Sequence, residues 1–170
     1  MGHNVSMQVP IGAILLASLA LTLVPAAQAQ TVTIAVTSLT VQAAANDTPP
    51  KNKANKGDSI SFRDLLYNRL PQFGKKTGKA VAYDVGVIRY LSSTKTMMTV
   101  KAIFPGFGTI TYSGPFDSNL KSNVLTITGG SGGFNGATGS VTIGAGATKS
   151  PNTYQLTIPG HVDLNGGGVA

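Results

Sequence analysis

The stretch ITGGSGGFNGATGSVTI, residues 127–143, gathers six glycines between two runs that suit β-strands. Glycine permits positive φ and close approach of two backbones. The cluster therefore predicts a tight turn, anchored by Phe134, with a bulge or sharp bend where the second strand begins. The glycines of this motif are Gly129, Gly130, Gly132, Gly133, Gly136 and Gly139.

A phosphate-binding loop is a poor explanation of these glycines. No Lys-Ser or Lys-Thr pair follows them as in a P-loop, and no G-x-G-x-x-G sequence opens a helix there. No Asp stands where a calcium-binding β-helix repeat would have one. The motif is better explained by backbone geometry.

On both sides of the motif, apolar and polar residues alternate with the period of two that is typical of β-strands. The alternation is clearest in residues 31–37, 97–104 and 153–158. Residues 64–70 contain Leu65, Leu66 and Leu70 at a spacing that also fits one helical turn. Many short strands, with no helix long enough to cover a sheet, are compatible with two architectures, a β-sandwich or a closed β-barrel. A closed barrel has the advantage that no strand is left with an unpaired edge. We predict about eight strands, near residues 31–41, 59–63, 80–91, 96–104, 108–112, 123–128, 139–144 and 152–158.

The N-terminal segment has the pattern of an export signal. An apolar run over residues 11–24, too short to span a bilayer comfortably, precedes the small-x-small sequence Ala27-Gln28-Ala29. The usual basic region is missing, since the first Lys or Arg is Lys51. We interpret residues 1–29 as a signal-peptide helix, with a retained amphipathic or membrane helix as the alternative. The rest is then secreted, or kept in a periplasm or cell wall, without an integral membrane span after cleavage.

The remaining chain has the size of one domain, which we place at residues 30–160, followed by a flexible tail at residues 161–170. It carries all 13 basic and all six acidic residues, a net charge of +7. The lysines concentrate in two loops, which are either simply solvated or attractive to anionic lipid or polysaccharide. Nucleic acid is disfavoured as a partner, because no aromatic residues alternate with the lysines. The lack of cysteine excludes disulfides and a thiolate nucleophile.

The glycine stretch resembles the GG[ST]G-x-[FY]-x-G-A-x-G signature of plant allene oxide cyclases and dirigent proteins. Residues 57–67, GDSISFRDLLY, and residues 104–116, FPGFGTITYSGPF, resemble two more cyclase segments in the same order. This resemblance covers most of the mature chain. It implies an all-β fold, a single eight-stranded antiparallel β-barrel with an apolar cavity open at one end, and a trimer or dimer.

The resemblance also implies a chemistry that needs neither a metal nor an organic cofactor. The cyclases close a fatty-acid epoxide into a cyclopentenone, and dirigent proteins guide phenoxy-radical coupling or quinone methide cyclisation. The cyclase apparatus is largely absent here, because the sequence contains no glutamate. If Pro50 matches the water-binding proline of the family, Val41 takes the place of the Glu, Ala43 that of one Asn, and Asp64 that of a second Asn.

Two aspartates remain as candidate acids, Asp64 and Asp84, because dirigent proteins use pocket aspartates as general acids. For Asp64 the alternative is a turn residue just after a strand, and for Asp84 an exposed barrel face or an interface. The single mature histidine, His161, lies beyond the last predicted strand, where it can complete neither a metal site nor a Ser-His-Asp triad.

We expect a secreted barrel that binds a small apolar or phenolic ligand, either for dirigent-like stereochemical guidance or for simple binding. The alternatives are an isomerase or cyclase with a relocated acid, and a cell-wall or matrix barrel. The candidate ligand-binding side chains, for which a role in the core is the alternative, are Ile60, Phe62, Ile88, Phe104, Tyr112 and Phe116.

Overall fold

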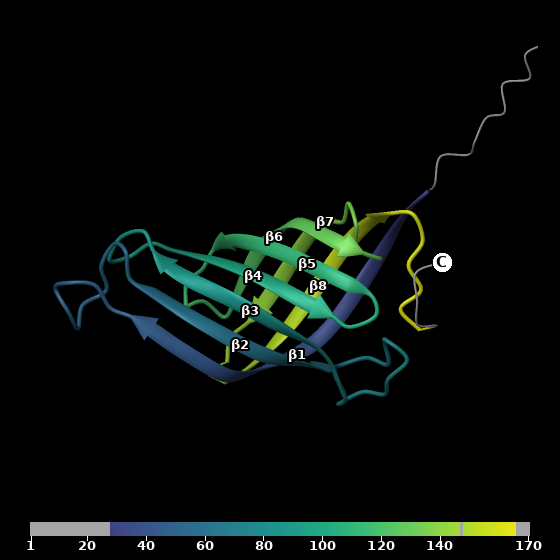
Figure 1. Ribbon diagram of the computed structural model, residues 1–170, viewed down its shortest axis with the longest axis horizontal. Coiled ribbons are helices and arrows are strands. Elements are labelled where there is room, and N and C mark those ends of the chain that lie inside the picture. The colour runs from purple at the N-terminus through teal and green to yellow at the C-terminus, as the bar shows by residue number, and fades with distance from the viewer. Residues whose placement is uncertain (1–27, 147, 166–170) are drawn as a thin grey trace, which may run out of the picture.

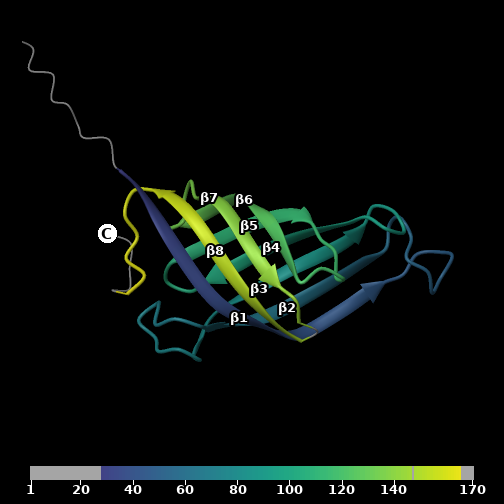
Figure 2. The ribbon, with the colours of Figure 1, turned by 180° about the vertical axis from the view of Figure 1, so that it is seen from behind.

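The computed structural model describes residues 28–146 and 148–165 of the 170-residue chain. Consecutive strands pair antiparallel and β8 pairs with β1, so the sheet closes into an eight-stranded barrel (Figures 1 and 2). The all-β antiparallel barrel predicted from the sequence is thereby confirmed. The strands are β1 (Ala29–Asn46), β2 (Ser59–Asn68), β3 (Ala80–Tyr90), β4 (Thr96–Phe104), β5 (Gly108–Pro115), β6 (Ser122–Gly132), β7 (Thr138–Gly144) and β8 (Lys149–Pro159).

Residues 1–27 of the predicted signal peptide lie outside the described residues. Over residues 28–146 and 148–165, no helix is long and apolar enough to cross a membrane.

The alternation of side chains decides which face of each strand is buried. In β4 the even-numbered residues Met98, Val100, Ala102 and Phe104 point into the barrel and are buried, while Met97 on the other face is exposed. Strand β2 is longer than predicted. Residues 64–67 pair with both β1 and β3, and Asn68 with β1, so the leucine spacing there is not a helical turn.

The turn in the glycine motif begins later in the sequence than predicted. Residues 129–132 still belong to β6 and pair with β5, so the turn begins only after Gly132. Gly132 has a φ of 61°, where glycine is favoured. Gly130 instead allows close packing, because a Cβ there would lie 2.1 Å from the carbonyl oxygen of Phe134. Phe134 itself is fully buried, as expected for an anchor.

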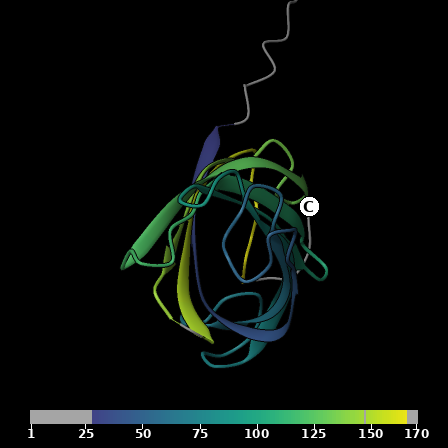
Figure 3. The same cartoon turned by 90° about the vertical axis from the view of Figure 1, so that its left-hand side faces the viewer.

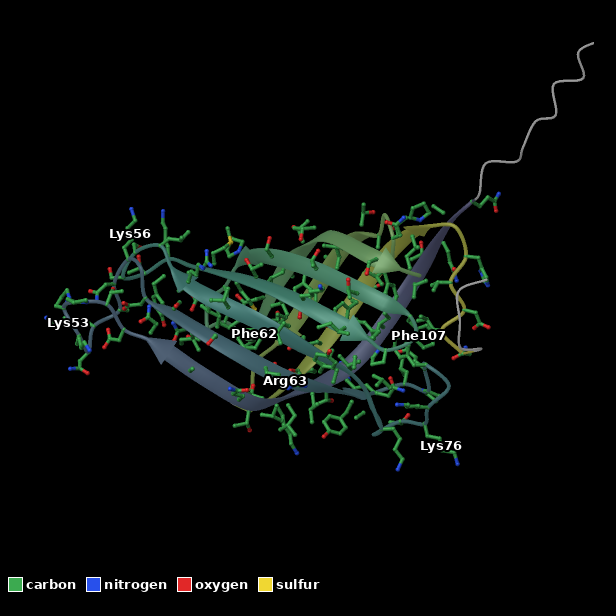
Figure 4. The ribbon with its side chains drawn as sticks, viewed as in Figure 1. Lys53, Lys56, Phe62, Arg63, Lys76 and Phe107 are labelled. Atoms are coloured by element: carbon green, nitrogen blue, oxygen red, sulfur yellow. The ribbon has the colours of Figure 1, made fainter. Side chains whose placement is uncertain are left out.

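The barrel is plugged at the end where β1 begins. Phe73, Phe104, Phe107 and Phe134, which we call the aromatic plug, pack there in ring contacts with centroids 5.0–5.4 Å apart. Figure 4 places Phe107 at this end and Lys53 and Lys56 at the other. The plug leaves only the opposite part of the interior for a ligand.

Residues 161–165 pack over the aromatic plug, although the sequence predicts a flexible tail from residue 161. Val162 is buried, and its N–H donates to the side-chain oxygen of Gln30 at 2.8 Å. The carbonyl of Leu164 accepts from the N–H of Phe73. Residues 161–165 are mostly polar, but Val162 and Leu164 pack against the hydrophobic core.

Candidate functional site

A cavity of about 490 Å³ occupies the barrel interior away from the aromatic plug. All eight strands contribute to its lining, and its wall is largely apolar, with Ile60, Ile88, Met98 and Val100 among its members. Its rim includes Leu120, which is 52% exposed, and the loops that join β5 to β6 and β7 to β8. Figure 3 views the barrel from this end. The volume lies within the range usual for sites that bind small molecules.

The structure places five of the six candidate ligand-binding side chains in the lining of this cavity. Phe104 is the exception. It points into the barrel as expected, but as the last residue of β4 it lies in the aromatic plug, 6.0 Å from the ring of Tyr154. The side chains that line the cavity are Ile60, Phe62, Ile88, Tyr112 and Phe116.

The ring of Phe62 packs across bare backbone on the neighbouring strand. Phe62 and Gly86 are register partners in β2 and β3, and both side-chain positions face inward. A Cβ on Gly86 would lie 2.3 Å from Cζ of Phe62. Gly86 therefore leaves room for the tip of this ring, which a larger residue would displace.

The two candidate acids face each other across β2 and β3. Asp64 and Asp84 are register partners, both line the cavity, and they are 8% and 1% exposed. Asp64 therefore lies in the middle of a strand rather than in a turn after one, and Asp84 lies on the inner face of the barrel rather than the outer one. Two buried carboxyl groups at one place are costly to keep ionised together.

Hydroxyl groups hold one oxygen of each carboxyl group. The hydroxyl of Ser38 donates to Oδ2 of Asp64 at 2.5 Å, and the hydroxyl of Tyr112 donates to Oδ2 of Asp84 at 3.4 Å. The hydroxyl of Tyr154 lies 3.5 Å behind that of Tyr112. Oδ1 of both aspartates has no hydrogen-bond partner within the described part of the chain. Both Oδ1 atoms are also closed to solvent.

Burial, and after it the charge of Asp64 on the neighbouring strand, raise the pKa of Asp84 to about 8, while the hydroxyl of Tyr112 works against the rise. Burial also raises the pKa values of Tyr112 and Tyr154 well above their ordinary range. Asp84 therefore carries a proton at neutral pH, and both phenols stay protonated. A carboxyl group with a pKa near the working pH, inside an apolar cavity, suits proton donation.

No basic side chain in the lining offsets the two aspartates. Of the described residues around the cavity, none is Lys, Arg or His. Arg63, next to Asp64 in sequence, points outward, with its guanidinium carbon 4.9 Å from the ring centroid of Tyr83 (Figure 4). Within the described ranges, no group of three or more His, Cys, Asp or Glu side chains is placed to hold a metal ion.

Sequence reasoning missed several polar members of the site, among them the buried Ser38 and Asn152. Each is two residues from a buried apolar position of its strand, Val36 in β1 and Tyr154 in β8, so each has the inward phase. Asn152 is 3% exposed and lines the cavity, and its Oδ1 has no partner among the described residues. A polar residue in phase with the buried face of a strand was the signal that could have identified both.

A second hollow, of about 310 Å³, lies at the plugged end beside residues 161–165. Its polar centre is Gln72, whose side chain accepts from the N–H of Ala35 at 3.1 Å and donates to the carbonyl of Thr33 at 2.6 Å. These bonds join the β2–β3 loop to β1. We regard this hollow as structural.

Solved structures show which known proteins share this architecture. Pyocyanin demethylase is 24% identical over 74% of this chain and all of its own, with a TM-score of 0.64. A pterocarpan synthase dirigent protein is 12% identical over 81% of this chain and 99% of its own, with a TM-score of 0.57. The fold is a dirigent-like barrel. A Diels Alderase from Streptomyces koyangensis also has it, at 18% identity over 84% of this chain and 74% of its own, with a TM-score of 0.60.

No family model matches the chain, and no curated protein matches it in sequence. At these low identities, the dirigent-like barrel is shared as a fold, and function has to be argued from the site. The predicted kinship with dirigent proteins is confirmed at the level of the fold. The kinship with allene oxide cyclases stays a prediction.

Proposed function

We propose that this dirigent-like barrel is a secreted protein that binds a small apolar or phenolic molecule in its cavity and guides the stereochemistry of that molecule's reaction. One observation carries the proposal: Asp84 and Asp64 are buried side by side in the lining of a cavity that opens at one end, where burial and the charge of Asp64 raise the pKa of Asp84 to about 8. An apolar wall with a few convergent polar groups is the usual form of a small-molecule site.

The side chains of the cavity fit a reaction that needs a positioned proton. The rings of Phe62, Tyr112 and Phe116 provide flat walls for an aromatic substrate. Asp84 donates its proton to the carbonyl oxygen of a bound quinone methide, an internal hydroxyl of the substrate attacks the exocyclic carbon, and the proton of that hydroxyl returns to Asp84. The reaction is an isomerisation, so no oxidant, reductant or cofactor enters its balance.

The charge of Asp64 sets the direction of the proton transfer. After Asp84 has given up its proton, two carboxylates would face each other in a buried place, which is unfavourable. Asp84 is therefore driven to take a proton back at the end of the reaction. The hydroxyl of Tyr112 keeps Asp84 oriented through both states, because Tyr112 itself does not ionise near neutral pH.

The proteins that share the fold support a reaction on a small molecule. Their names describe a pterocarpan synthase dirigent protein, a Diels Alderase and a demethylase of pyocyanin. A cyclase or isomerase with true turnover is the second candidate, favoured by the pKa of Asp84 near 8. A purely structural cell-wall barrel is disfavoured, because such a role gives no use for a largely apolar cavity with a buried acid pair.

The binding proposal is tested by thermal denaturation of the purified protein with fatty-acid, terpenoid and phenolic compounds. A ligand that binds only the native state raises the melting temperature with its concentration. We expect phenolic compounds to do so, and the binding proposal fails if no compound of the three classes has this effect on a folded sample.

Turnover is tested with a quinone methide that carries an internal hydroxyl group. We expect the wild-type protein to bias the stereochemistry of the ring and Asp84→Asn to lose this bias. Asp163→Asn, an exposed aspartate remote from the cavity, is the matched control. A racemic product that forms no faster than without the wild-type protein removes both the guiding and the enzymatic role and leaves simple binding.

A further inference from the structure

We propose that the cavity binds organic cations: it takes a flat aromatic molecule with one positive charge in preference to a neutral or anionic molecule of the same shape. The inference rests on the proposed binding role of this cavity and assigns the ligand class. Four observations carry it, namely the unpartnered acceptors, the absence of basic side chains, the aromatic walls and the uncompensated charge of the acid pair.

Three buried oxygen atoms in the lining lack a hydrogen-bond donor. They are Oδ1 of Asp64, Oδ1 of Asp84 and Oδ1 of Asn152, and none of them has a partner within the described residues. A buried acceptor without a partner costs free energy comparable to a lost hydrogen bond. These oxygens are covered by neighbouring atoms, so a ligand does not bond to them directly, but their uncompensated negative potential favours a positive charge in the cavity and disfavours a carboxylate.

The ionisable side chains that the described residues bring to the cavity lining include carboxyl groups but no basic groups. Asp64 and Asp84 line it inside, the exposed Asp117 lies at its rim with its carboxyl group accepting from Asn119, and the described lining contains no Lys, Arg or His. Arg63 is held on the outer surface against Tyr83. No basic side chain of the described lining therefore offsets the charge that the pair carries, which grows when Asp84 loses its proton near pH 8, and a buried negative charge without a counter-charge favours a cationic ligand.

The walls of the cavity suit a cation with an aromatic body. Phe62, Tyr112 and Phe116 line it together with the carboxyl groups. The face of an aromatic ring attracts a cation within about 6 Å of its centroid, and carboxylates combined with rings form the usual recognition surface for quaternary ammonium groups. Neutral aromatic molecules gain the ring contacts but not the electrostatic ones.

The net charge of +7 does not reverse this preference. It arises mainly from exposed lysines, such as Lys51, Lys53 and Lys56 in the β1–β2 loop. Salt at physiological strength screens exposed charges beyond about 8 Å. These lysines slow the approach of a cation, whereas the affinity is decided by the side chains in contact with the bound ligand.

The preference depends on pH in a defined direction. The titratable groups that line the cavity are Asp64, Asp84, Asp117 and Tyr112, with Tyr154 behind Tyr112. Asp84 is the one that loses its proton near pH 8, while both tyrosines stay protonated there. A cation of fixed charge therefore binds more tightly above pH 8 than below it. A neutral molecule of the same shape does not gain affinity.

The test uses three probes that share one naphthalene ring system: trimethyl(2-naphthylmethyl)ammonium, 2-naphthalenemethanol and 2-naphthoate. Their dissociation constants are measured by isothermal titration calorimetry at pH 6 and pH 9. We expect the ammonium probe to bind at least tenfold more tightly than the alcohol at pH 9, with a smaller ratio at pH 6 and with naphthoate the weakest. Asp64→Asn and Asp84→Asn are expected to reduce the ratio at pH 9 at least fivefold, and Asp163→Asn to leave it unchanged.

Each result counts for or against the cation site. Equal binding of the ammonium probe and the alcohol at both pH values, or tighter binding of naphthoate, overturns the inference and leaves the proposed function intact. No binding of any probe, while phenolic compounds still stabilise the protein, also overturns only the inference. No binding of the probes or of the phenolic, terpenoid and fatty-acid compounds removes both. If the aspartate variants do not fold, the pH dependence in the wild-type protein decides.

Discussion

Replacing Asp84 by Asn should make the protein more stable at alkaline pH and leave its stability nearly unchanged at acidic pH. Asp84 is almost fully buried, and its pKa rises from the ordinary value of 3.8 to about 8 on folding. The native state therefore holds a proton that the unfolded state loses above pH 4. By linkage, the contribution of this group to stability is fully present below about pH 4, is lost as the pH rises toward 8, and is constant above that.

The size of the effect follows from the difference between the two pKa values. About 4 pH units at about 1.4 kcal/mol each give an upper bound of about 6 kcal/mol in the free energy of unfolding. Relaxation of the acid pair and entry of water reduce this bound, and we expect about 2–4 kcal/mol. Asparagine has nearly the same shape and no charge, so Asp84→Asn recovers this amount at pH 8.5, corresponding to roughly 5–15 °C in melting temperature.

The assay is urea unfolding of the wild-type protein, Asp84→Asn and the control Asp163→Asn at several pH values from 3.5 to 8.5. Comparing each variant with the wild-type protein at the same pH removes the contributions of the other carboxyl groups. The stability difference for Asp84→Asn should be near zero at pH 3.5 and grow steadily toward pH 8.5. A difference that does not depend on pH would refute the reasoning, because Asp84 would then not retain its proton in the folded state.

Three further changes test separate parts of the structure. Phe104→Ala should lower the free energy of unfolding by about 3–5 kcal/mol, because the ring is buried in the aromatic plug. Ligand affinity should change little, and a large loss of affinity in the folded variant would contradict the placement of Phe104 outside the cavity. Gly86→Ala should displace the ring of Phe62, because the new Cβ would lie 2.3 Å from Cζ of that ring. Binding of aromatic probes should then weaken severalfold, and an unchanged dissociation constant would show that the ring of Phe62 does not contact the bound probe. Tyr112→Phe removes the donor to Asp84, so the pKa of Asp84 measured by carboxyl-carbon NMR should rise further; a fall would argue against that hydrogen bond.

Alternation in the sequence was enough to predict most of the strands, because the interior of a barrel accepts every second side chain. Residues 96–104 were predicted as a strand and form β4 with the same bounds. The prediction stopped β2 too early, since an aspartate at position 64 resembles the end of a strand. A buried carboxyl group in mid-strand is unfavourable locally, and its hydrogen bond from Ser38 on β1 is a contact that the local sequence does not reveal.

The site was harder to predict than the fold, because it depends on register and on the level along the barrel axis. The sequence could nominate Asp64 and Asp84 as acids, but only the pairing of β2 with β3 places them opposite each other. Phe62 and Phe104 have the same inward phase in their strands, yet one lines the cavity and the other closes the far end. A periodic pattern carries no information about which end of the barrel a residue occupies.

The position of a bound aromatic molecule tests the central claim most directly. In a crystal structure of the protein with 2-naphthol, we expect the ring to lie in the cavity beside Phe62 and Tyr112, with its hydroxyl within hydrogen-bond distance of Asp84 or Asp64. A ring bound in the hollow beside His161 at the plugged end, or a cavity without the ring at saturating concentration, would contradict the account.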